Sequence, residues 1–172
     1  MRATLLAICV AVLAMCLPGA AGAQQFVFVV RHAEKIDNSA DPLLSAAGEA
    51  RAQRLAEMLS ASAVGAIYTT QYRRTVQTAA PLAKRLGIGS NIVPAKETET
   101  LLEKIRTHGK TLGNALGTGS AVLVVGHSNT VPAILKGLGH STDIVIADEA
   151  FDDLFAVVVQ LAGPPLLMRL KY

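Results

Sequence analysis

Short, continuous apolar runs alternate along the chain with longer stretches in which apolar residues recur every three or four positions. The short runs, rich in β-branched residues, are typical of buried strands, and the longer periodic stretches indicate amphipathic helices. The pattern predicts strands over residues 26–30, 64–69, 91–95, 121–125, 155–161 and 166–170. It predicts helices over residues 45–60, 72–86, 98–116 and 130–138.

The order of these elements predicts the fold class. Strands and helices alternate through the first four strands, which is typical of a parallel sheet with helices on both faces. The last two strands are separated only by a turn at Gly163-Pro164-Pro165, and this spacing favours a hairpin. We therefore expect an α/β fold: a three-layer α/β/α sandwich with a mostly parallel sheet and a C-terminal antiparallel hairpin.

The N-terminal residues form a separate pattern before the first strand. Arg2 is followed by an uncharged apolar run over residues 3–17, and small residues occupy positions 21–23. A positive start, an apolar core of this length and small residues at a cleavage site are typical of a secretory signal peptide. We predict a signal peptide over residues 1–23, a single catalytic domain over residues 24–172, and a periplasmic or secreted location.

Two alternatives for the N-terminal segment remain open. A membrane-spanning anchor would need a longer apolar run to cross about 30 Å of hydrocarbon with ease. A lipoprotein acylated at Cys16 is the second alternative, although Met15 fits the lipidation motif poorly.

Composition narrows the function of the mature domain. Cys9 and Cys16 are the only cysteines and both precede residue 24, which excludes disulfides, cysteine-based metal sites and a cysteine nucleophile after cleavage. The net charge of the chain is +3 and no run of Lys or Arg occurs, so we expect no nucleic-acid partner. We also expect no membrane span after signal removal, and the pattern carries no signal for the oligomeric state.

Chemically active side chains follow the predicted strands. Arg31 and His32 follow the first strand, and Arg74 stands at the start of the helix after the second. Glu97 follows the third strand and His127 the fourth. Because ligands bind beyond the carboxyl ends of parallel strands, we expect these five side chains to converge at one edge of the sheet.

This set of side chains suits a phosphoryl group. Arginine supplies permanently charged donors that bind a phosphoryl dianion bidentately, and a helix N-terminus near Arg74 adds backbone N–H groups and a favourable dipole. A neutral imidazole can attack phosphorus when a hydrogen bond holds its other nitrogen. A protonated carboxylic acid can then give a proton to the leaving oxygen. This chemistry requires no metal and no cofactor.

Four segments resemble motifs of the histidine phosphatase superfamily, which includes the phosphoglycerate mutases. Residues 30–34 (VRHAE) resemble its Arg-His-Gly signature, with Ala33 in place of the usual glycine. Residues 44–48 (LSAAG) resemble its Leu-Thr-x-x-Gly helix start, and residues 74–79 (RTVQTA) are similar to its Arg-Thr/Ala-x-x-Thr-Ala segment. Gly126-His127, which follows an apolar strand, is similar to the segment that carries the family's second histidine.

The resemblance implies a phosphomonoesterase, similar to the histidine acid phosphatases, that works through a phosphohistidine intermediate. It implies that His32 is the phosphorylated nucleophile and that Arg31, Arg74 and His127 hold the phosphoryl oxygens. The spacing of the motif favours Arg74 over its neighbour Arg73. The resemblance also implies a phosphorylated substrate, which is a small molecule, a glycan or a protein. We expect hydrolysis in preference to mutase activity, since a mutase needs a closed site that keeps water out.

The family has two positions for the proton donor, one in each branch. In one branch of the family an Asp directly follows the second histidine, but Ser128 stands there in this chain. In the other branch a Glu follows the third strand, and Glu97 is the nearest match. We therefore predict Glu97 as the general acid, with Glu99, Asp148 and Glu149 as alternatives.

Three other functions compete with this assignment. In a serine hydrolase, Ser128 would be the nucleophile, because residues 126–130 nearly match a nucleophile elbow; they end in Thr130 where that motif has Gly. Such an enzyme also needs an acid and then a histidine downstream, and only His140 follows. A non-catalytic module would use the same residues to hold phosphate or sulfate. A zinc hydrolase that uses His32, Glu34 and His127 is the third, but no metal-ligand spacing supports it.

Overall fold

The computed structural model describes residues 25–112, 121–160 and 163–172. The predicted signal peptide and Cys16 lie outside the described residues, as does the end of the helix predicted over residues 98–116. The strands are β1 (Gln25–Arg31), β2 (Val64–Thr69), β3 (Ser90–Ile92), β4 (Ala121–Gly126), β5 (Asp153–Val159) and β6 (Leu166–Lys171). The helices are α2 (Ala46–Leu59), α3 (Arg73–Leu86), α4 (Thr98–Leu112) and α5 (Thr130–Gly137).

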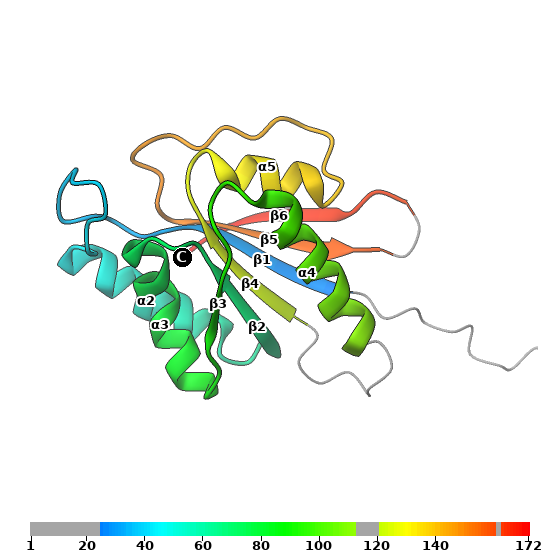
Figure 1. The fold of residues 1–172 in the computed structure, drawn as a ribbon, viewed down its shortest axis with the longest axis horizontal. Helices are drawn as coiled ribbons and strands as arrows, with labels where there is room; N and C mark the ends of the chain where they lie inside the picture. Colours follow the sequence, from blue (N-terminus) through cyan, green and yellow to red (C-terminus); the bar gives the residue numbers. More distant parts are fainter. Residues whose placement is uncertain (1–24, 113–120, 161–162) are drawn as a thin grey trace, which may run out of the picture.

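The strands form one sheet in the order β3-β2-β4-β1-β5-β6 (Figure 1). Strands β1 to β4 pair in parallel, whereas β5 runs antiparallel to both β1 and β6. The predicted fold class is therefore confirmed, including the C-terminal antiparallel hairpin. Among the described residues, no helix is long and apolar enough to cross a membrane.

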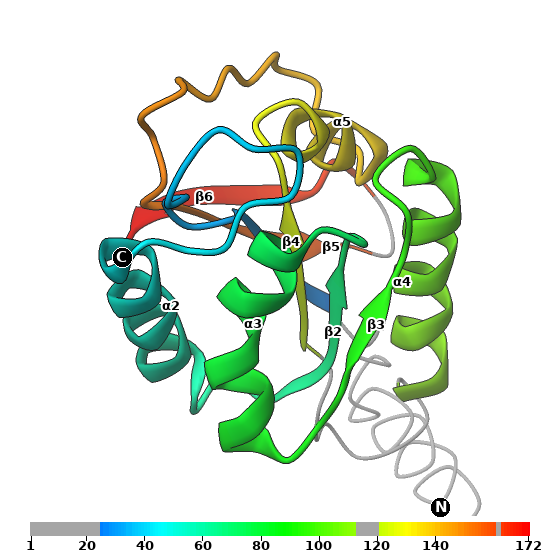
Figure 2. The ribbon, with the colours of Figure 1, turned by 60° about the vertical axis from the view of Figure 1, so that its left-hand side comes forward.

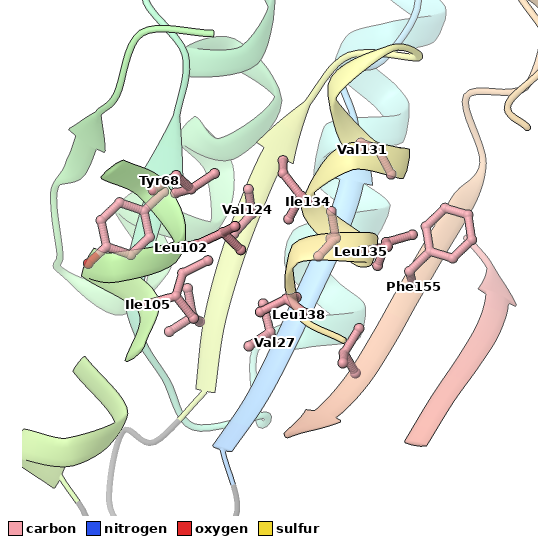
Figure 3. Packing of buried hydrophobic residues seen from close by; sticks show 14 of the residues in the cluster. Val27, Tyr68, Leu102, Ile105, Val124, Val131, Ile134, Leu135, Leu138 and Phe155 are labelled. Carbon is pink, nitrogen blue, oxygen red and sulfur yellow. The ribbon is translucent and has the colours of Figure 1, made fainter. Parts of the chain in front are cut away.

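Strand β4 shows how the sheet separates two hydrophobic layers. All its residues are buried, and they alternate between the two faces. Val122 and Val124 belong to the core under α4 and α5, while Leu123 and Val125 belong to the core under α2 and α3. Figure 3 shows the first of these cores, with side chains of α4 and α5 directed at the sheet. A sheet buried on both faces explains why its strands read as continuous apolar runs.

The start of α2 is fixed against the loop that follows β1. The Ser45 hydroxyl accepts a hydrogen bond from the Gly48 N–H at 3.2 Å, which is the predicted helix cap. The Ser45 N–H donates to the Glu34 carbonyl at 2.9 Å. A Cβ atom on Gly48 would collide with the backbone of Glu34, so only glycine fits here. The LSAAG segment therefore braces the residues next to His32.

Strands β3 and β5 differ most from the prediction, for local reasons. Strand β3 ends at Ile92, before Pro94, because proline has no N–H to donate to a neighbouring strand. Strand β5 begins at Asp153, a buried carboxylate that a hydrophobic pattern does not include. Arg169 of β6 compensates this burial with two hydrogen bonds to Asp153, at 2.7 and 2.8 Å.

Candidate active site

The carboxyl ends of β1, β2 and β4 meet at one edge of the sheet, because these strands are parallel and adjacent. Figure 2 shows the loop after β1 and the long loop from α5 to β5 at the same end of the molecule. A cavity of about 510 Å³ opens there and includes Arg31, His32, Arg74 and His127 in its lining. Its other lining residues are Lys35, Tyr72, Ala95, Lys96, Ser128, Asn129, Thr130 and Asp148.

His32 is buried and held from both its backbone and its ring. Its N–H donates to the Gly126 carbonyl at 2.9 Å, which ties the residue to the end of β4. Its ring Nδ1 lies 2.8 Å from the Ala33 carbonyl oxygen. A carbonyl can only accept, so Nδ1 carries the proton and Nε2 keeps its lone pair. His32 is therefore set in the tautomer that a nucleophilic imidazole requires.

The electrostatic surroundings of His32 keep its ring neutral. Burial is the largest cause and lowers the pKa of His32 to about 3, against a smaller opposing effect of the hydrogen bond to Ala33. The neighbouring His127, Arg74 and Arg31 lower this pKa further. Nε2 therefore remains available for attack at both neutral and mildly acidic pH.

Arg31 links the cavity to the loop between α5 and β5. Its Nη1 donates to the carbonyl oxygens of Ala147 and Asp148 at 2.9 and 2.8 Å, and its guanidinium lies 4.2 Å from the ring centre of Phe151. Burial lowers the pKa of Arg31, and the charges of Asp148 and Glu149 oppose this shift. Arg31 therefore both lines the cavity and fixes one of its walls.

Arg74 and Arg73 have different surroundings. The Arg74 side chain is 14% exposed, lies over the Tyr72 ring at 4.4 Å and approaches Nδ1 of His127 at 3.5 Å. The Arg73 side chain is 58% exposed and binds Asp41, with Nε 3.2 Å from the carboxylate. Arg74 is thus the arginine at the cavity, as the motif spacing predicts.

Both cavity arginines keep a buried donor unused. The Nε atoms of Arg31 and Arg74 are buried and have no hydrogen-bond partner among the described residues. A buried charged donor without an acceptor is costly, so such donors favour an anion that can accept from them. Two of them beside one cavity suit a group with several anionic oxygens.

His127 is positioned at the start of α5. Its N–H donates to the Thr130 hydroxyl at 2.8 Å, and its ring centre lies 5.3 Å from that of His32. Its Nε2 lies 3.0 Å from the Thr70 hydroxyl oxygen. Burial, followed by the charges of Arg74 and Arg31, lowers the pKa of His127 to about 4. The ring is therefore neutral at pH 7 in the unliganded protein.

Two of the carboxylates considered as proton donors, Glu97 and Asp148, line two neighbouring cavities. Glu97 lines a smaller neighbouring cavity that shares Ala95 and Thr130 with the cavity around His32, and its N–H donates to the Pro94 carbonyl in a turn. Asp148, one of the alternatives, lines the cavity that contains His32. Glu34, which would be needed for a zinc site with the two histidines, is held by Arg51 through three contacts of 2.6 to 2.9 Å.

Three residues around the cavity were not found by sequence reasoning about the site. Thr70 contacts His127, Tyr72 packs on Arg74, and Phe151 packs on Arg31. A hydroxyl side chain just after a predicted strand is a signal that could have identified Thr70. Phe151 had no such signal, because it lies in an irregular loop far along the chain.

Comparison with known proteins gives one family match and several solved structures with a similar fold. Residues 27–105 match the family model of the histidine phosphatase superfamily, branch 1. The protein histidine phosphatase SixA, solved with tungstate, is 16% identical with a TM-score of 0.65, covering 85% of this chain and 96% of its own. A mycobacterial glucosyl-3-phosphoglycerate phosphatase is 15% identical with a TM-score of 0.62, covering 78% of this chain and 90% of its own.

No curated protein matches the chain in sequence. At these low identities the solved structures establish the fold alone. The family match adds the segment that carries Arg31, His32 and Arg74. Over residues 27–105, slightly less than half of its length, the chain is therefore similar to the histidine phosphatase superfamily, and its fold resembles that of SixA.

Proposed function

We propose that this chain is a phosphomonoesterase that acts through a phosphohistidine at His32. The observation that carries the proposal is the arrangement at the cavity. A histidine with a free Nε2 lone pair lies beside two arginines, Arg31 and Arg74, each with an unpaired buried donor. The predicted signal peptide supports action outside the cytoplasm.

The reaction would proceed in two displacements at phosphorus. In the first, Nε2 of His32 forms a bond to phosphorus while the bond to the leaving oxygen breaks, and an acid protonates that oxygen. In the second, water attacks the phosphohistidine and gives a proton to the conjugate base of that acid, the P–N bond breaks and inorganic phosphate forms. Arg31 and Arg74 would stabilise the charge on the phosphoryl oxygens in both steps, with His127 beside them.

The proposal predicts hydrolysis without a metal. Arginine side chains supply the positive charge that a metal ion supplies in other phosphatases, so p-nitrophenyl phosphate should be hydrolysed equally well with and without EDTA. Vanadate, which mimics the trigonal-bipyramidal phosphoryl group, should inhibit competitively. A phosphate-binding module would bind vanadate without hydrolysing any monoester. Activity that is lost in EDTA and restored by zinc would instead support a metal enzyme.

The charged residues that line the cavity bear on which substrates it can bind. Lys35 and Lys96 add positive charge to its lining, and Asp148 adds one negative charge. Two proteins with this fold are named for different substrates: SixA for protein histidine, and the mycobacterial enzyme for glucosyl-3-phosphoglycerate. We propose a phosphorylated small molecule, glycan or protein as the substrate.

We propose Asp148 in place of Glu97 as the proton donor, because Asp148 lines the cavity that contains His32. We expect Asp148→Asn to lower kcat on alkyl phosphates by about 10²-fold, because a poor leaving group needs a proton. p-Nitrophenyl phosphate, whose leaving group is stable as an anion, should lose much less. The matched control is Glu97→Gln, which should leave both rates nearly unchanged. A selective loss in Glu97→Gln, with none in Asp148→Asn, would restore the sequence-based prediction of Glu97.

A further inference from the structure

Two buried threonines form a hydroxyl chain behind His127. Thr70 follows β2 and is 7% exposed, while Thr75 lies in the first turn of α3 and is fully buried. The Thr70 oxygen lies 3.0 Å from Nε2 of His127 and 3.0 Å from the Thr75 oxygen. The Thr75 oxygen in turn lies 2.8 Å from the Tyr72 carbonyl. The chain therefore runs from an active-site ring to a backbone acceptor.

The direction of each hydrogen bond follows from its end groups. The guanidinium of Arg74 can only donate, so Nδ1 of His127, 3.5 Å away, accepts. In the neutral ring the proton is then on Nε2, which donates to Thr70. The Thr70 hydroxyl donates onward to Thr75, and Thr75 donates to the Tyr72 carbonyl, which can only accept.

We propose that Thr70 is a positioning residue that, supported by Thr75, holds His127 as the Nε2–H tautomer and keeps Nδ1 on the side of Arg74. Nδ1 is then the nitrogen that receives a proton when a phosphoryl group binds, from solvent for a dianion or from the ligand itself for a monoanion. The ring could then donate from Nδ1 to a phosphoryl oxygen while Nε2–H stays on Thr70. This catalytic consequence rests on the proposed function, but the tautomer does not.

The tautomer can be measured directly by NMR of the histidine ring nitrogens in the unliganded protein at neutral pH. The unmodified protein and Thr70→Ser should show a protonated Nε2 on His127. Thr70→Val, which removes the acceptor with little change in shape while Arg74 still faces Nδ1, should leave the buried Nε2–H without a partner, so that the ring loses its fixed orientation and its nitrogen signals no longer report a single Nε2–H form. Thr69→Val is the matched control, because the neighbouring Thr69 hydroxyl is buried without a partner among the described residues. An Nδ1–H ring in the unmodified protein, or an unchanged ring in Thr70→Val, would overturn the proposal.

Kinetics with p-nitrophenyl phosphate test the catalytic consequence. Thr70→Val should lower kcat/KM by about 10- to 100-fold, the loss known for removing groups that orient metal-binding histidines. Thr70→Ser should restore activity to about a third or more of the original, since it keeps the hydroxyl. If Thr70→Val fails to fold, Thr75→Val and Thr75→Ser decide by the same two measurements. An inactive unmodified protein would contradict the proposed function alone, because the ring nitrogens still report on Thr70.

Discussion

Replacing His32 with alanine should abolish both phosphomonoester hydrolysis and the covalent intermediate. The ring is the only group assigned to form the bond to phosphorus, and its Nε2 is free because Nδ1 is held by the Ala33 carbonyl. Loss of a nucleophile leaves only binding and charge stabilisation, so the rate should fall on the order of 10⁵-fold. Turnover of p-nitrophenyl phosphate by purified protein, followed at saturating substrate, measures this loss.

Trapping the intermediate separates His32 from the competing nucleophile. Phosphohistidine is labile in acid and stable in base, unlike phosphoserine, so rapid alkaline quenching during turnover should leave phosphate on His32. Ser128→Ala is the matched control; it should keep most of the activity and the label. A serine hydrolase would show the reverse ranking of the two variants. Hydrolysis by His32→Ala at the unmodified rate would refute the assignment of the nucleophile.

The sequence could locate those site residues that adjoin regular elements. Strand β1 ends at Arg31 and β4 ends at Gly126, so a hydrophobic pattern that finds the strands also finds His32 and His127 just beyond them. Parallel pairing then brings these residues to one edge. The LSAAG segment was equally readable, because both the cap at Ser45 and the close approach at Gly48 depend on residue type.

The sequence could not predict that the loop between α5 and β5 forms one wall of the cavity. Arg31 holds this loop through carbonyl oxygens that lie 116 and 117 residues away in sequence. Every residue carries a carbonyl, so no residue type signals such a contact. Asp148 and Phe151 therefore reach the site without any local pattern that predicts it. The prediction for Glu97 rested on its position shortly after β3. The chain turns at Pro94, so the direction of the strand does not determine where Glu97 lies.

Arg74→Met should cause the second-largest loss of activity, about 10³-fold in kcat/KM for p-nitrophenyl phosphate, because a preorganised charged donor is removed from the transition state. Methionine retains much of the apolar stem of arginine, so packing against Tyr72 changes little. The pKa of His127 should rise as well, since the Arg74 charge is one of the causes that lower it. Titration of the His127 ring by NMR would measure that shift independently of activity.

Arg73→Met provides the matched control for Arg74→Met, because both arginines lie near Asp41 but only Arg74 lines the cavity. Arg73 is exposed and bound to Asp41, and the loss of such a surface ion pair typically changes stability by at most about 1 kcal/mol. The kcat/KM of Arg73→Met should therefore stay within about twofold of the unmodified value. Equal losses in the two variants would mean that general positive charge near α3, and not contact between Arg74 and the phosphoryl group, supports the reaction. A large loss in Arg73→Met alone would show that the motif spacing and the cavity lining both point to the wrong arginine.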